Sequence, residues 1–127
     1  MELEPGLTAR VELTVAEADT AQEVGSGDVP VLGTPRVLAL AEAATVRATA
    51  RYLPTGTTTV GTRVHLEHLT ATPIGRTVVA AATLSTVDGR RLGFDVTVHD
   101  GDELAARGTI ERVLVDRERF LAKATGR

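Results

Sequence analysis

The segment Gly33–Tyr52, GTPRVLALAEAATVRATARY, decides how this chain folds. A glycine and Thr34 precede Pro35, and this order predicts the start of a helix, with Thr34 as the N-cap and Pro35 as the first helical residue. Apolar residues dominate the segment until Arg47 and Arg51, whose charges suit the C-terminal end of a helix. A helix this long and apolar is expected to pack against a sheet.

One carboxylate interrupts this apolar helix. Glu42 is the only charged residue between Val37 and Val46. Long charged side chains are seldom buried unless they are paired or used, so Glu42 is the first candidate for chemistry. Two other interpretations stay open: a buried structural salt bridge with Arg112 or His68, or a position on a solvent-facing stripe of the helix.

Length and composition limit the class of protein. The chain has 127 residues, 43% of them hydrophobic and 24% charged, which predicts a single folded domain spanning residues 1–127. A net charge of −3 and three aromatic residues argue against a nucleic-acid-binding surface, and the absence of Cys excludes thiolate chemistry and Cys-ligated metals. We find no signal peptide and no apolar run of membrane-spanning length, so we expect a soluble cytoplasmic protein.

Alternating apolar and polar residues predict one strand before the helix and four after it. The predicted strands are Leu7–Val15, Thr58–Leu69, Thr77–Val87, Arg91–Val98 and Leu104–Val115. Short helical segments are expected at Ala16–Gln22 and Asp116–Ala124. Short turns such as Asp88-Gly89 join the later strands, so they are expected to be antiparallel. This order predicts an α+β fold in which one helix covers one face of an antiparallel sheet.

Strand parity indicates which polar side chains face the helix. His68 shares the parity of the apolar residues of its strand and is expected to face the helix if no bulge intervenes, whereas Thr59 falls on the polar face. Arg112 is likewise a charged residue on a mainly apolar face. Gly61 is compatible with a bulge or with close packing. Taken singly, His68 also fits a hydrogen-bonded core residue and Thr34 a simple helix cap.

Several short motifs together carry a family resemblance. They are Gly33-Thr34-Pro35, Glu42 in the helix, Thr59-Val60-Gly61-Thr62, His68-Leu69-Thr70-Ala71-Thr72-Pro73, Gly89-Arg90-Arg91-Leu92, His99-Asp100-Gly101 and Gly108-Thr109-Ile110-Glu111-Arg112. In their order and spacing, the chain resembles the fluoroacetyl-CoA thioesterase-like branch of the hot-dog superfamily. The resemblance extends over most of the chain, from the first strand to about Phe120.

This resemblance implies a hot-dog fold, in which an antiparallel sheet wraps around one long helix. It also implies a homodimer or a dimer of dimers with acyl-CoA sites at the subunit interface, and a CoA thioester as substrate with no cofactor or metal. The implied catalytic set is Thr34, Glu42 and His68. The residues implied to bind the substrate or support the site are Gly33, Gly61 and Arg112.

The predicted reaction is hydrolysis of a small acyl-CoA thioester to a carboxylate and CoA. Glu42 would activate water or attack the carbonyl itself, and His68 would orient Glu42 or water and protonate the leaving thiolate. A non-catalytic acyl-CoA-binding or regulatory module is the alternative. A hot-dog hydratase would need an Asp in its motif, and the Val29–Tyr52 region has none.

Two further expectations concern the substrate. CoA carries phosphates, so basic residues are expected near the mouth of the site, and the candidates are Arg36, Arg47, Arg51, Arg90 and Arg91. The resemblance also implies an aromatic lid ahead of the helix, but Gly25–Leu32 is small and aliphatic. The expected chemistry is therefore thioester hydrolysis, without a fluoroacetyl group being specified.

Overall fold

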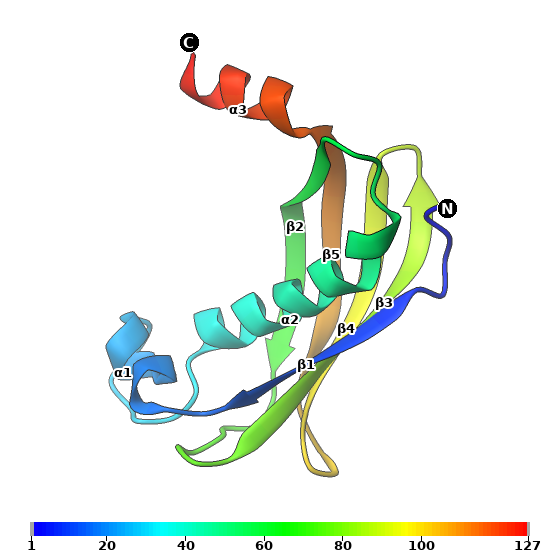
Figure 1. Cartoon of the computed structure of the whole chain (residues 1–127). Helices are drawn as coiled ribbons and strands as arrows, with labels where there is room; N and C mark the ends of the chain where they lie inside the picture. The colour runs from blue at the N-terminus through cyan, green and yellow to red at the C-terminus, as the bar shows by residue number, and fades with distance from the viewer. Residues whose placement is uncertain (1, 127) are drawn as a thin grey trace.

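A five-stranded antiparallel sheet curves around one long helix in the computed structural model, which describes residues 2–126 (Figure 1). The strands are β1 (Thr8–Thr14), β2 (Thr57–His68), β3 (Thr77–Asp88), β4 (Arg91–Asp100) and β5 (Glu103–Asp116). The helices are α1 (Ala21–Val24), α2 (Thr34–Thr49) and α3 (Arg117–Thr125), with 3-10 turns at Glu17–Asp19 and Ala50–Tyr52. The α+β prediction is confirmed, and each strand lies within two residues of its expected position.

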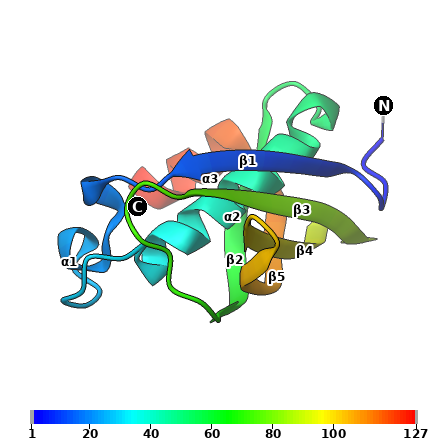
Figure 2. The same ribbon diagram turned by 90° about the horizontal axis from the view of Figure 1, so that it is seen from below.

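The strand order is β1-β3-β4-β5-β2, which leaves β1 and β2 at the two edges of the sheet. Strands β3, β4 and β5 form consecutive hairpins, and β2 pairs with β5 at the far side. Helix α2 packs mostly on β1 and β3. When the molecule is viewed from below, α2 passes behind β1 and β3 (Figure 2).

The core lies between α2 and the concave face. The helix contributes small residues and two larger ones: Val37, Leu40, Ala41, Ala44 and Ala48. The sheet contributes larger side chains, among them Leu84, Leu92, Phe94, Val98 and Ile110. Small residues on the buried side of the helix allow it to lie close to the sheet, so the two elements pack tightly with few aromatic side chains.

The start of α2 differs from the prediction. Gly33 is the N-cap and Thr34 is the first helical residue, with Pro35 next to it as expected. The Thr34 hydroxyl makes no capping hydrogen bond because it bonds instead to a side chain of β2. The predicted cap role for Thr34 is therefore wrong, and its hydroxyl is directed into the candidate site. The far end at Tyr52 is confirmed, since a 3-10 turn continues the helix to that residue.

A β-bulge in β2 changes which residues face the helix. The pairing of β2 with β5 shifts between Gly61 and Arg63, so side chains before and after the bulge follow opposite parity. Thr59, expected on the polar face, is buried. His68 still faces the helix, as predicted, because the expected parity holds for residues after the bulge. The prediction for His68 had assumed a strand without a bulge. That assumption was wrong, and the bulge lies next to Gly61.

Candidate active site

A carboxylate and a guanidinium meet between α2 and β5. Arg112 Nη1 donates to Glu42 Oε2 at 3.2 Å. The Arg112 side chain is only 9% exposed, whereas the Glu42 side chain keeps 34% of its surface accessible. Among the described residues, no hydrogen bond reaches Glu42 Oε1. The pair thus fixes one oxygen of Glu42 and leaves the other available at an accessible surface.

Arg112 is itself held by Thr59. Its Nε donates to Thr59 Oγ1 at 2.9 Å, and its Nη2 donates to the Thr59 carbonyl at 2.9 Å. Burial lowers the pKa of Arg112, and the charge of Glu42 acts in the opposite direction. All three guanidinium nitrogens are engaged, so the group can orient the carboxylate without moving. Strand parity alone did not predict that Thr59 faces inward. Gly61, two residues later, was the sequence signal for the bulge that turns Thr59 inward.

Gly61 brings the backbone of β2 directly against Glu42. A Cβ atom placed on Gly61 would lie 2.6 Å from Glu42 Oε2 and 3.5 Å from Arg112 Nη1. A Cβ atom and a carboxylate oxygen cannot lie this close without a clash. Only glycine at position 61 therefore allows the Glu42 carboxylate to occupy this position. The structure therefore brings together three of the predicted site residues, Glu42, Gly61 and Arg112.

Thr34 and His68 form a second pair at the start of α2. A hydrogen bond of 2.8 Å joins Thr34 Oγ1 to His68 Nδ1. His68 Nε2 is buried and has no hydrogen-bond partner among the described residues. If the threonine hydroxyl donates to Nδ1, the hydrogen of the neutral ring lies on Nε2. A buried nitrogen without a partner is uncommon, and it marks a position where a water or a substrate atom would be stabilised.

Burial also sets the charge state of His68. It lowers the pKa of His68 below the ordinary value of 6.5, and the main chain of Thr70 partly offsets the effect. The imidazole is therefore neutral in the folded protein at pH 7. It can donate one hydrogen and accept another, as a relay between a substrate and Thr34 requires.

This lowered pKa predicts how stability depends on pH. Below pH 6.5, His68 takes up a proton in the unfolded chain before it does so in the folded protein. The free energy of unfolding should therefore fall as the pH is lowered from 6.5 through the folded pKa. In His68→Gln, the decrease in the free energy of unfolding that is due to this histidine should disappear. Urea unfolding at a series of pH values measures this free energy. His65→Gln, a change on the same strand at an exposed position, is the matched control. If it removes the same fall, His68 is not the source.

The two pairs are separate within one chain. Thr34 and Glu42 are eight residues apart on α2, which corresponds to about 12 Å along the helix axis. Among the described residues, no hydrogen bond joins Glu42 to Thr34 or His68. The predicted meeting of all three catalytic residues is therefore not observed within a single protomer.

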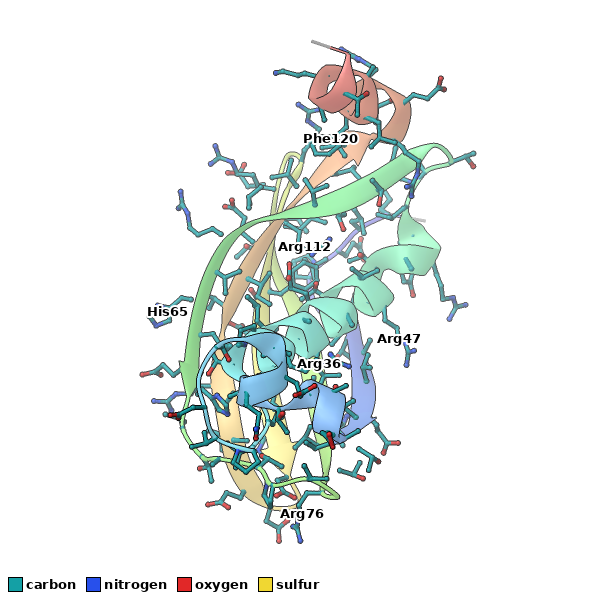
Figure 3. The ribbon with its side chains drawn as sticks, turned by 90° about the vertical axis from the view of Figure 1, so that its left-hand side faces the viewer. Arg36, Arg47, His65, Arg76, Arg112 and Phe120 are labelled. Carbon is teal, nitrogen blue, oxygen red and sulfur yellow. The ribbon has the colours of Figure 1, made fainter. Side chains whose placement is uncertain are left out.

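Other predicted residues have structural explanations. Gly33 is buried, and a Cβ there would lie 2.9 Å from Val24 Cγ2, so its packing on α1 accounts for the glycine. Arg36 pairs with Asp19 at 2.9 Å. Arg47 donates to the carbonyl of Arg10 at 3.1 Å and lies on the outer side of α2 (Figure 3). These contacts engage two of the five arginines suggested for phosphate binding.

The described residues form neither a cluster of metal ligands nor a membrane-spanning helix. Within the described part of the chain, no group of three or more His, Asp or Glu residues is placed to hold a metal ion. Among residues 2–126, no helix is long and apolar enough to cross a membrane. The two pairs supply a carboxylate, a guanidinium, a hydroxyl and an imidazole.

Comparison with known proteins gives a consistent assignment. Residues 15–118 match the family described as fluoroacetyl-CoA-specific thioesterase. The chain is 43% identical over 93 residues to the fluoroacetyl-CoA thioesterase of Streptantibioticus cattleyicolor, a match that covers 73% of this chain and 67% of that protein. A solved structure of the fluoroacetyl-CoA thioesterase FlK superimposes with a TM-score of 0.93 at 33% identity, covering 100% of this chain and 98% of that one.

A more distant structure supports the fold alone. A thioesterase superfamily member from Thermus thermophilus superimposes with a TM-score of 0.86 at 24% identity, covering 94% of this chain and 89% of that one. Together with the curved sheet around α2, these matches confirm the predicted hot-dog fold. The chain therefore belongs to the fluoroacetyl-CoA-specific thioesterase family.

Proposed function

We propose that this protein hydrolyses small acyl-CoA thioesters to a carboxylate and CoA. The proposal rests on the position of Glu42. One of its carboxylate oxygens is bonded to Arg112 and lies against the backbone of Gly61, and the other oxygen is accessible. Membership of a thioesterase family supports the same reaction. The proposed reaction uses no cofactor or metal, because water supplies the atoms that are added and the carboxylate serves as the base or nucleophile.

Glu42 Oε1 would act on the thioester in one of two ways. As a general base it takes a proton from water while the water oxygen bonds to the carbonyl carbon. As a nucleophile it attacks that carbon, CoA thiolate leaves, and water then hydrolyses the anhydride. In both routes the C–S bond breaks, the acyl group gains one oxygen from water, and a proton goes to the thiolate. Arg112 would hold Glu42 in a fixed orientation through its hydrogen bond to Oε2.

The Thr34–His68 pair would stabilise the charge that develops on the substrate. With Nδ1 bonded to Thr34, Nε2 of His68 can donate to the thioester oxygen or to the departing sulfur. The first turn of α2 lies beside this pair, and its amide groups favour negative charge. Removal of one such donor typically costs about 3 kcal/mol of transition-state stabilisation.

A second copy of the chain would bring the two pairs together. Strand β2 is an edge strand, and its stretch Gly61–His65 is exposed. If two copies pair antiparallel along β2 about a twofold axis close to His65, His68 of one copy lies opposite the bulge beside the partner's Gly61, against which the partner's Glu42 rests. We therefore propose a homodimer with two composite sites. A molar mass measured in solution tests it, and a monomeric active enzyme would contradict it.

The acyl group is expected to be small but not strictly fluoroacetyl. The loop ahead of α2 has no aromatic side chain, and Val29 in it is exposed. A site without a bulky apolar cover discriminates weakly between acyl groups of similar size, because a single methylene is worth only about 1–3 kcal/mol in a pocket.

The decisive test is a panel of acyl-CoA esters, including acetyl-, propionyl- and fluoroacetyl-CoA, assayed for release of free thiol. We expect turnover of several short esters, with fluoroacetyl-CoA not exclusively preferred. Binding of these esters without release of thiol would instead support the alternative, a non-catalytic acyl-CoA-binding module. Neither binding nor release would refute both functions.

A further inference from the structure

Helix α3 has little packing of its own. It is nine residues long, and none of them is buried. Two of its apolar side chains are largely open to solvent, since Phe120 is 41% exposed and Leu121 is 51% exposed. Within one copy the helix packs on the end of β5, and its first amide donates to the carbonyl of Gly56 at 2.9 Å. A helix this short is marginal in water unless an apolar face is covered, so α3 is expected to have a further partner surface.

The helix extends past the free edge of the sheet. It leaves the end of β5 and passes beyond β2, on the side away from β3 and β4, in both Figure 1 and Figure 2. Strand β2 is the edge strand along which the proposed homodimer pairs. Helix α3 therefore lies on the side where a second copy of the chain would be.

The register along β2 shows how far α3 is from the centre of such a dimer. With the twofold axis close to His65, Thr57 is eight residues from the axis, which corresponds to about 26 Å along the strand. Asp116 pairs with Thr57, and α3 begins at the next residue. The start of α3 therefore lies about 26 Å from the axis, in the direction in which the other copy's β2 ends.

The β4–β5 turn of the other copy lies at nearly the same level. Strand β5 begins at Glu103, three residues beyond Ala106, and Ala106 pairs with His68. Glu103 is therefore six residues from the axis, and the difference of two residues from the start of α3 is about 7 Å along the strands. Across the strands, three spacings separate the two copies of β5, roughly 14 Å, and a helix of nine residues is about as long. Helix α3 can therefore reach this end of the other copy.

The charges of the two surfaces are complementary. Helix α3 carries Arg117 and Arg119, and within the described part of the chain neither side chain forms an ion pair. The β4–β5 turn carries Asp102 and Glu103, which are both exposed. Opposite charges on facing surfaces favour association of one particular pair of surfaces.

The loop 69–76 adds an apolar surface beside this turn. Leu69 and Ile74 are each 49% exposed, much like the two apolar residues of α3. The amide of Leu69 donates to the carbonyl of Ala105 at 2.7 Å, which ties the loop to β5. Arg76, at the end of the loop, is engaged by Asp100 at 2.8 Å and so leaves the turn acidic. The other copy thus offers apolar and acidic groups side by side, as α3 offers apolar and basic ones.

We propose that α3 of each copy packs across the dimer on the other copy's β4–β5 turn and loop 69–76. Phe120 and Leu121 lie against Leu69 and Ile74, and Arg119 lies close to Glu103. This inference rests on the homodimer of the proposed function and adds a second contact area to the pairing along β2.

The contact has a consequence for the active site. The loop begins directly after His68, and within it Thr72 is fully buried. The carbonyl of Thr72 accepts from the amide of Leu32 at 2.9 Å, two residues before Thr34. A helix that packs on this loop therefore supports the Thr34–His68 pair of the other copy.

Disulfide cross-linking tests the contact directly, because the chain has no Cys. In one copy Phe120 and Arg76 lie at opposite ends of the molecule, so cysteines at positions 120 and 74 cannot join within a chain (Figure 3). The variant I74C/F120C should form a covalent dimer on mild oxidation, seen on a non-reducing gel. The single variants I74C and F120C should not. V24C/F120C, which places the first cysteine at an exposed valine of α1 instead, is the matched control and should give no cross-link.

Charge reversal gives an independent result. R119E and E103R should each raise the dissociation constant of the dimer about tenfold, because like charges then face each other at two symmetric contacts. The double variant R119E/E103R should recover most of the affinity, since the exchanged charges attract again. R51E reverses an exposed arginine after α2 and should leave the dissociation constant unchanged. Sedimentation equilibrium measures all four variants.

The outcomes separate this contact from the proposed function. A wild-type dimer in which I74C/F120C forms no cross-link would overturn the α3 contact and leave the homodimer standing. A monomeric wild type would overturn both the contact and the homodimer. Release of thiol from an acyl-CoA ester is measured on the same samples, and a cross-linked protein without turnover would refute the thioesterase while supporting the contact.

Discussion

Glu42→Gln should lower kcat/KM for the best acyl-CoA ester by at least about 10³-fold, while the protein remains folded. The amide keeps the size of the side chain and can accept from Arg112, but it neither takes a proton from water nor attacks a thioester. Loss of the reacting group in hydrolytic enzymes typically costs several orders of magnitude. The measurement is thiol release at saturating and at limiting ester, together with thermal unfolding.

A matched control separates this effect from a general loss of negative charge. Glu67→Gln removes a carboxylate that also pairs with an arginine of β5, at 3.0 Å, but in an exposed pair. It should retain wild-type turnover, because exposed ion pairs contribute little. If Glu42→Gln and Glu67→Gln both keep wild-type turnover, Glu42 is not the reacting carboxylate and the active site lies elsewhere.

The fold followed from local patterns in the sequence. The apolar run in Gly33–Tyr52 had too few polar positions for a surface helix, and the alternating segments after it had turn residues between them. Both patterns reflect burial, which dominates the energetics of a small domain, so the helix and the strands were predicted within a few residues. Periodicity alone predicted no more than a helix packed on a sheet. The resemblance to a known family identified this arrangement as a hot-dog fold.

The site was predicted less completely, because its geometry depends on contacts distant in sequence. The isolated charge of Glu42 and the inward parity of Arg112 did predict their pairing as one of the open interpretations. The role of Thr59 was missed, since the bulge at Gly61 reverses parity and Gly61 in the sequence was equally compatible with close packing. The separation of Thr34 from Glu42 was also missed, although eight residues on one helix correspond to about 12 Å along its axis.

Arg112→Met should destabilise the protein by about 2 kcal/mol and also reduce turnover severely. Methionine fills much of the space of the arginine but leaves Glu42 without its partner and Thr59 without two hydrogen bonds. Breaking a fully buried pair costs about 3–5 kcal/mol, and the smaller value is expected here because Glu42 can still reach water. Urea unfolding measures the stability and thiol release measures the activity.

A double-mutant cycle shows whether this loss comes from the pair. Arg112→Met should cost less in the Glu42→Gln background than in the wild type, because no unpaired carboxylate is left behind. The difference, a coupling energy of about 1 kcal/mol, is expected to survive high salt, since the guanidinium is shielded from solvent. Arg107→Met, which removes the other arginine of β5 that pairs with a glutamate, should change the unfolding free energy by less than about 0.5 kcal/mol. Equal losses for Arg112→Met and Arg107→Met would mean that the Glu42–Arg112 contact is no more than a surface ion pair, and the oriented carboxylate on which the mechanism depends would have no structural support.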